Sequence, residues 1–207
     1  MAEFLLELFS EEIPAGLQAS GAGDLEKLVL KGLKESGLAH GKSATLHGPR
    51  RLALVIDDVA EKSPDISEER KGPRVGAPEK ALAGFLRGAR LDNIDQCETV
   101  ADKKGEFYVA MIEKPGRPAT DILSEVVNDA IQQFPWPKSM RWGSGKLRWV
   151  RPLHSILALL GGKVVDIEID GIKSGDMAIG HRFMAPKAVK VKDFTDYKKK
   201  LAKAFVM

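Results

Sequence analysis

The order of strand-like and helix-like segments is the feature that most limits the fold of this 207-residue chain. The chain opens with a compact apolar run, EFLLELF (residues 3–9), which is typical of a buried strand. Leu25, Val29 and Leu33 then form a helical stripe that ends at Gly37. Further along, strands and helices follow one another without regular strand–helix–strand repeats. We therefore predict an α+β fold with a mixed, largely antiparallel sheet covered on one face by helices.

Hydrophobic period and turn residues assign the other segments. Expected strands cover 44–59, 104–116, 163–172 and the start of 188–207, and expected helices cover 77–91, 117–134, about ten residues within 151–162, and the end of 188–207. Residues 61–76 are charged and interrupted by prolines, which predicts an exposed loop or linker that could be mobile. We expect residues 1–186 to form one α+β module and residues 187–207 to begin a further element that is cut short.

Charge is unevenly distributed along the chain. The net charge is +3, but residues 1–26 hold six acidic side chains and no Lys or Arg. Such asymmetry indicates either one acidic and one basic face or two differently solvated surfaces. The net charge alone is too small to identify nucleic acid as a partner.

Cysteine usage and apolar runs bear on the compartment. The single cysteine, Cys97, cannot form an intramolecular disulfide, which fits a reducing compartment. The N-terminus has no basic region of the kind that precedes a signal peptide core, and the longest apolar run, 153–160, is too short to cross a bilayer. We therefore expect a cytoplasmic protein that does not associate with membranes.

Motifs for catalysis are weak. GLAHGKS (residues 37–43) has three residues between its glycines, where a phosphate-binding loop needs four. The four histidines never stand three to five residues apart, so we expect no metal site. The acidic neighbours of Cys97 raise the pKa of its thiol, which favours a packed, unreactive cysteine. Glu11 and Glu12 could form an acid/base pair, but adjacent carboxylates at a helix start more often interact with the helix dipole.

Positive charge mixed with aromatic residues is the remaining signal. Residues 136–154, WPKSMRWGSGKLRWVRPLH, contain all three tryptophans and five cations with no carboxylate. GPRRL (48–52) and GHRFM (180–184) add further cations. Lys and Arg neutralise phosphates, and aromatic planes stack on unpaired bases. The candidate RNA-binding residues are Arg50, Arg51, Lys138, Arg141, Lys146, Arg148, Arg151 and Arg182.

A structural interpretation of the same residues stays open. The tryptophans could anchor a long connection on the core, with the cations extending outward into solvent or into salt bridges. In that case the aromatic side chains would stabilise the fold and would not touch RNA.

Six sequence blocks, read in order, resemble a known family. They are FLLELFSEEIP (4–14), GPRRLAL (48–54), GAPEKALAGFLRG (76–88), KSMRWG (138–143), RWVRPLHSILALLGGKVV (148–165) and GIKSGDMAIGHRFM (171–184). Together they are similar to the N-terminal region of the β subunit of bacterial glycyl-tRNA synthetase, the α2β2 type. The family usually shows Gly-Thr where Phe9-Ser10 stand and Thr where Gly48 stands. Its β subunit is much longer and continues into a helical domain and an anticodon-binding region.

The resemblance implies a division of labour between subunits. ATP, Mg²⁺ and glycine are expected in the α subunit, and this region is expected to hold no cofactor, no metal and no catalytic residue. The implied partners are tRNA(Gly) and the α subunit, with the acidic N-terminal strand facing away from RNA. The alternative is a protein–protein scaffold that contacts the α subunit without direct RNA contact, with Trp and Arg as interface anchors.

Overall fold

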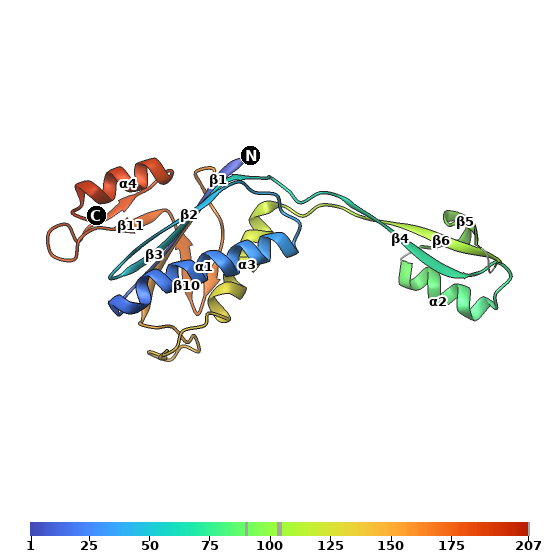
Figure 1. Ribbon diagram of the computed structural model, residues 1–207, viewed down its shortest axis with the longest axis horizontal. Helices are drawn as coiled ribbons and strands as arrows, with labels where there is room; N and C mark the ends of the chain where they lie inside the picture. Colours follow the sequence, from blue (N-terminus) through green and yellow to red (C-terminus); the bar gives the residue numbers. More distant parts are fainter. Residues whose placement is uncertain (90, 103–104, 207) are drawn as a thin grey trace. The chain divides into compact units, whose positions relative to one another are not determined.

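A computed structural model describes residues 1–89, 91–102 and 105–206. Three positions of the predicted elements lie outside the described residues. They are Arg90 in the expected helix 77–91, Lys104 at the start of the expected strand 104–116, and Met207 at the chain end. The chain divides into a larger compact unit, 1–63 with 117–207, and a smaller one, 64–116 (Figure 1). The expected boundary after residue 186 does not coincide with this division and stays a prediction.

Both units mix helices with strands, so the predicted α+β class is confirmed. The larger unit contains β1 (Ala2–Ser10), α1 (Ala15–Glu35), β2 (Ser43–Gly48), β3 (Arg51–Val59), α3 (Ala119–Gln132), β7 (Leu153–Leu160), β8 (Lys163–Val164), β9 (Glu168–Ile169), β10 (Ile172–Gly175), β11 (Met177–Ile179), β12 (Ala188–Lys190) and α4 (Phe194–Lys203). The smaller unit contains β4 (Ile66–Arg74), α2 (Glu79–Ala89), a short 3-10 helix (Ile94–Gln96), β5 (Glu98–Asp102) and β6 (Gly105–Lys114). Within the described part of the chain, no helix is long and apolar enough to span a membrane.

A seven-stranded sheet forms the centre of the larger unit. Its strand order is β2-β3-β1-β7-β10-β9, and β8 pairs with β7. Every pairing in it is antiparallel except that of β7 with β10. Leu6 on β1 stands opposite Leu54 on β3 and Ala158 on β7, so the most apolar strands lie side by side. This arrangement agrees with the predicted largely antiparallel sheet.

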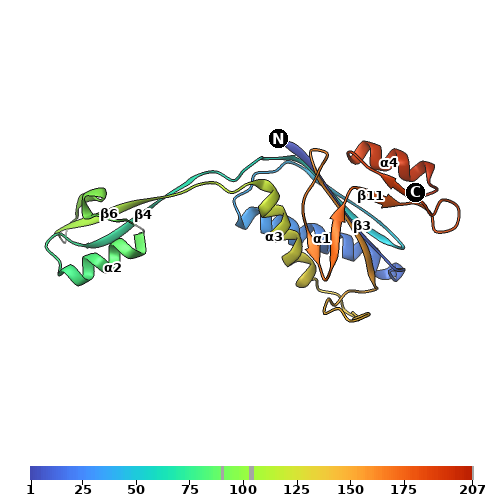
Figure 2. The same cartoon turned by 180° about the vertical axis from the view of Figure 1, so that it is seen from behind.

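Both faces of this sheet are covered, which corrects the expectation of one covered face. Alternate residues of β1, such as Phe4 and Leu6, pack into the core that includes residues of α1 and α3. Leu5 points to the other face, where it packs in a second cluster with Tyr197 and Leu201 of α4. Helix α4 lies away from α1 and α3 (Figure 2). β1 is buried at seven consecutive positions. A strand covered on both faces carries apolar residues at successive positions and not only at alternate ones.

Residues 153–160 form strand β7, so the helix predicted within 151–162 is wrong. The segment LHSILALL has apolar residues at nearly every position, and periodicity alone cannot separate such a run from a buried helix. Tertiary context decides, because β1 offers an antiparallel partner along the whole length of this segment.

The smaller unit corrects a third expectation. Most of the predicted loop 61–76 is strand β4, which pairs with the central strand β6 of a three-stranded sheet. β4 is an edge strand with charged, exposed residues, a composition that sequence reasoning takes for a loop but that also protects sheet edges from aggregation. In the larger unit, the Ser63 amide donates to the Arg117 carbonyl at 3.0 Å, so the chain segments that leave and re-enter that unit are adjacent.

Candidate nucleic-acid interface

The long connection between α3 and β7, residues 136–151, is here called the basic connection. Its tryptophans attach it to the larger unit. Trp149 is completely buried and exchanges backbone hydrogen bonds with Met140 at 2.8 and 3.1 Å. Trp136 stacks on Phe134 with ring centroids 4.6 Å apart and meets the Trp149 ring edge-on at 5.2 Å. Trp142 is half-buried and packs against the same core. The interpretation that the tryptophans anchor the connection is confirmed.

Helix α1 is shaped to receive this aromatic cluster. Gly21 lies so close to Trp136 that a Cβ at this position would stand 2.6 Å from the ring atom Cη2. The absence of a side chain at residue 21 therefore lets the indole lie directly on the helix backbone. The Trp136 Nε1–H group is buried and has no hydrogen-bond partner among the described residues.

Asp170, just after β9, holds the other end of the connection. Its carboxylate accepts hydrogen bonds from the backbone amides of Lys146 at 3.0 Å and Leu147 at 3.1 Å. These bonds lower the pKa of Asp170, because they favour the charged carboxylate. Gly145 makes the approach possible, since a Cβ there would stand only 2.0 Å from an Asp170 oxygen.

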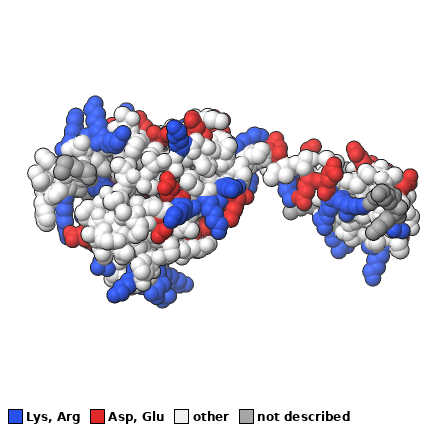
Figure 3. Space-filling view, viewed as in Figure 1, with Lys and Arg blue, Asp and Glu red and all other residues white. Residues whose placement is uncertain are grey.

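The cations of the connection project from this support. Lys138, Arg141, Lys146 and Arg148 are exposed, and none of them forms an ion pair with another described residue. Within the described part of the chain, Arg148 Nε donates to Ser139 Oγ at 3.2 Å, and the charge of Lys146 acts on the nearby Asp170 carboxylate without a close ion pair. Figure 3 shows Lys and Arg gathered at the end of the larger unit where this loop lies in Figure 1. The chemistry available here is electrostatic contact with an anion.

Arg51 lies in a different environment. It is 8% exposed and its guanidinium pairs with Glu7 at 2.9 Å and donates to the Ile179 carbonyl at 2.8 Å. Tyr197 of α4 also donates to Glu7. Burial raises the pKa of Glu7, and the nearby Arg51 charge opposes this shift. Arg51 therefore ties β1 and β3 to β11 and α4, which cover the same face of the sheet, and its charge is already neutralised by Glu7.

Arg50 and Arg182 gather around Glu11. Arg50 pairs with this carboxylate at 3.3 Å and lies over the Phe9 ring at 4.6 Å. Arg182 lies 3.6 Å from Glu11, and His154 Nε2 is 2.9 Å from it. The hydrogen bond to His154, followed by the charges of Arg50 and Arg182, lowers the pKa of Glu11. These cations are partly neutralised by acids of the N-terminal segment.

The eight candidate residues thus fall into separate groups. Arg50, Arg51 and Arg182 line one pocket, and Arg141, Lys146 and Arg148 line another with no residue in common. Arg151 is exposed, and its side chain donates to the neighbouring Val150 carbonyl. The sequence identified the cations, but not which of them have carboxylate partners.

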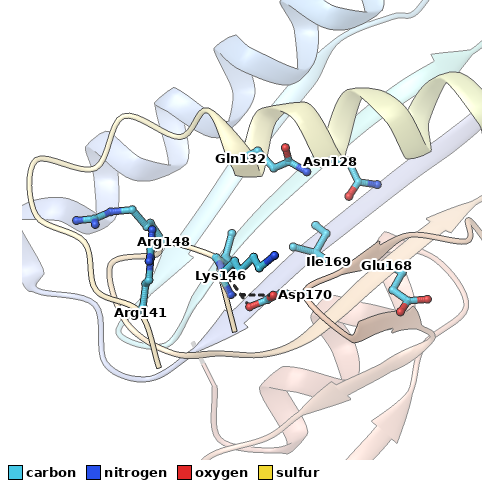
Figure 4. Close-up of a pocket in the computed structure, with 9 residues that line it drawn as sticks. Asn128, Gln132, Arg141, Lys146, Arg148, Glu168, Ile169 and Asp170 are labelled. Atoms are coloured by element: carbon cyan, nitrogen blue, oxygen red, sulfur yellow. Dashed lines mark hydrogen bonds between the residues drawn. The ribbon is translucent and has the colours of Figure 1, made fainter. Parts of the chain in front are cut away.

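The pocket beside the basic connection has a volume of about 430 Å³. Its lining comprises Asn128, Gln132, Arg141, Lys146, Leu147, Arg148, Glu168, Ile169 and Asp170. Figure 4 shows Asn128 and Gln132 reaching into it from α3, across from Lys146 and Asp170. Sequence reasoning missed the two amides, because polar residues on a helix are ordinarily solvated. The Asp170-Gly171 pair is a turn signal that could have drawn attention to Asp170.

The described residues offer little for metal binding or for cysteine chemistry. In the ranges that the structure describes, no group of three or more His, Cys, Asp or Glu side chains could hold a metal ion. Burial raises the pKa of the Cys97 thiol, the direction expected from the sequence, although the cause is burial and not its acidic neighbours.

Comparison with known proteins identifies the family. Residues 4–207 match the family described as glycyl-tRNA synthetase beta subunit. The chain belongs to this family. It is 57% identical to the glycine–tRNA ligase beta subunit of Ruegeria sp. strain TM1040 and 55% identical to that of Paracoccus denitrificans strain Pd 1222, in each case over 100% of this chain and 31% of the relative. The corresponding subunit of Cereibacter sphaeroides strain ATCC 17023 is 53% identical over 100% of this chain and 30% of its own length.

The chain therefore spans about a third of the length of these glycine–tRNA ligase beta subunits. The resemblance drawn from six sequence blocks is confirmed over nearly the whole chain. Family membership places the chain in a ligase subunit, and the basic connection is the feature of its structure most suited to an anionic partner.

Proposed function

We propose that this chain is a non-catalytic region of a glycine–tRNA ligase β subunit, and that its basic connection contributes to tRNA(Gly) binding. The observation that carries the proposal is the set of four exposed cations without ion pairs in the described structure: Lys138, Arg141, Lys146 and Arg148. Such cations can neutralise RNA phosphates without first breaking a salt bridge.

The proposed partners follow from the family. The β subunit would act with an α subunit that uses ATP, Mg²⁺ and glycine, in the cytoplasm. In that assembly this region would help to hold the tRNA while the α subunit carries out the chemistry. The buried Arg51 has no place in the proposed RNA surface, and Arg50, Arg151 and Arg182 are secondary to the four cations of the connection.

The salt dependence of tRNA binding tests this proposal. The affinity of the 207-residue chain for tRNA is measured between about 50 and 200 mM salt, the range over which phosphate contacts weaken strongly. Replacing Lys138, Arg141, Lys146 and Arg148 by Gln should lower the slope of log affinity against log salt by about 3. The matched control replaces Lys27, Lys31, Lys34 and Lys42, four exposed lysines of the same unit, by Gln. Equal slopes for the two quadruple variants would refute the proposal.

A protein-contact function is the second candidate, and an apolar surface favours it. Phe183, Met184 and Phe205 are 82%, 60% and 54% exposed. Exposed apolar side chains of this size are typical of interaction sites. This version differs from the scaffold expected from the sequence, because Trp149 is buried in the core and cannot be an interface anchor. Ser substitutions of Phe183 and Phe205 should weaken binding of the α subunit and leave the salt dependence of tRNA binding unchanged.

A further inference from the structure

The pocket beside the basic connection combines cations with two features that the phosphate-contact proposal does not use, uncharged amides and an apolar wall. One end carries the cations Arg141 and Arg148, and the wall formed by α3 carries the uncharged amides of Asn128 and Gln132 (Figure 4). Ile169 and Leu147, both largely buried, supply an apolar surface. A purely electrostatic surface needs neither the amides nor the apolar wall.

We propose that this pocket binds one unpaired nucleotide of an RNA strand, with its phosphate on Arg141 and Arg148 and its base edge on Asn128 and Gln132. The inference rests on the proposed RNA contact and names the part of the RNA that is held. A volume of about 430 Å³ lies within the range of small-ligand pockets, so a single nucleotide is a suitable occupant. Base edges carry hydrogen-bond donors and acceptors that Asn and Gln amides can match.

The amides have hydrogen-bonding capacity to spare. Asn128 Nδ2 donates to the Ser124 carbonyl at 2.9 Å, which fixes the side chain and leaves its Oδ1 without a partner among the described residues. The Gln132 amide forms no hydrogen bond within the described part of the chain. Recognition of unpaired bases by hydrogen bonds to their exposed edges is the common mode of sequence-dependent RNA binding.

The carboxylates of the pocket set its polarity. Asp170 is occupied by the Lys146 and Leu147 amides, and Glu168 lies 3.6 Å from Lys173. Both acids repel a phosphate from their side of the pocket. The phosphate is therefore directed to the arginine end, and the uncharged base is left to face the amides and the apolar wall.

Binding of single-stranded and fully paired RNA of equal length to the 207-residue chain tests this assignment. The wild-type chain should prefer the single strand. Replacing Asn128 and Gln132 together by Ala should weaken single-strand binding by roughly tenfold, since each lost hydrogen bond contributes about 0.5–1.5 kcal/mol. The slope with salt and the affinity for duplex should not change. Gln133→Ala is the matched control, because Gln133 is an exposed amide that lines a different pocket beside α1.

The remaining outcomes each decide the matter. Gln132→Ala alone, at an exposed position, should weaken single-strand binding and not duplex binding even if the double variant proves unstable. Equal losses on duplex and single strand, or no loss on either, would overturn the nucleotide assignment, and an altered slope in the quadruple cation variant would still support the phosphate contact. Competition by free nucleoside 5′-monophosphates without any RNA preference would reassign the pocket to a free nucleotide and also overturn the inference.

Discussion

Two regions of the larger unit contain arginines of similar appearance in the sequence but of opposite character in the structure. Around the N-terminal strand, Arg51 pairs with the buried Glu7, and Arg50 and Arg182 share Glu11. In the basic connection, Arg141 and Arg148 have no ion pair with any described residue. The difference shows that arginines alike in the sequence are neutralised by carboxylates in one region and left without a close ion pair in the other.

The largest expected effect concerns stability and lies in the N-terminal group. Arg51→Met leaves Glu7 buried without its counter-ion, and loss of one partner of a buried pair typically costs about 3–5 kcal/mol. Urea denaturation should report a loss of this size. Arg148→Gln removes an exposed cation and should change the free energy of unfolding little. An equal loss of this free energy in Arg51→Met and Arg148→Gln would contradict the difference between the two regions.

Because Trp136 packs on the backbone of α1, alanine substitutions at two glycines of this helix should change stability in opposite directions. Gly21→Ala places a methyl group against the indole, and such overpacking should destabilise the chain by about 1–3 kcal/mol. Gly23→Ala, in the same helix with nothing within 4 Å of the new Cβ, should stabilise it by about 0.5–1 kcal/mol. Thermal denaturation of the two variants distinguishes them, and shifts of the same sign would contradict the packing described.

Cation substitutions give a direct test of the difference between the regions. Arg141→Gln with Arg148→Gln should lower the salt slope of tRNA binding by about 1.5, as expected for two lost phosphate contacts. Arg50→Gln with Arg182→Gln should leave that slope nearly unchanged, because Glu11 and Glu12 partly neutralise these cations. A larger slope change for the second pair would move the RNA surface to the N-terminal region.

The smallest expected effect is a pH dependence at Asp170. Its pKa is lowered by the Lys146 and Leu147 amides, so its stabilising effect is complete above the unfolded value of about 3.9. That effect is lost as the pH falls from about 4 through the lower pKa of the folded state. The protection of these two amides from hydrogen exchange, relative to the unfolded chain at the same pH, should fall over this interval. Asp170→Asn tolerates the same left-handed backbone, φ 53°, and should remove the pH dependence. If amide protection in Asp170→Asn still depended on pH as in the wild type, the Asp170 carboxylate would not be the group that holds these amides.

Local patterns predicted part of this architecture. β1, α1, α3 and α4 follow apolar periodicity or compact apolar runs, which local residues specify. β7 and β4 could not be recognised, because the first has apolar residues on both faces and the second is a charged edge strand. The ion pair of Glu7 with Arg51 joins residues 44 positions apart, so no local pattern announces it.

The candidate site shows the same limit. The four cations of the connection were visible in the sequence, but their lack of partners and their support by Asp170 depend on contacts between distant segments. The charge asymmetry of residues 1–26 indicated either an acidic face or a differently solvated surface. In the fold, Glu7 and Glu11 instead pair with arginines from later segments, so the excess of acid is partly cancelled.

The adjacency of Ser63 and Arg117 has a consequence for how this chain could be dissected genetically. Residues 64–116 behave as an insertion between two hydrogen-bonded backbone positions, and Lys62 and Pro118 form a bridge at the same place. A gene in which this stretch is exchanged for a short turn would rejoin the two adjacent chain segments, from β3 to α3, without stretching the chain. Removal of the smaller unit should therefore leave the fold that carries the basic connection intact.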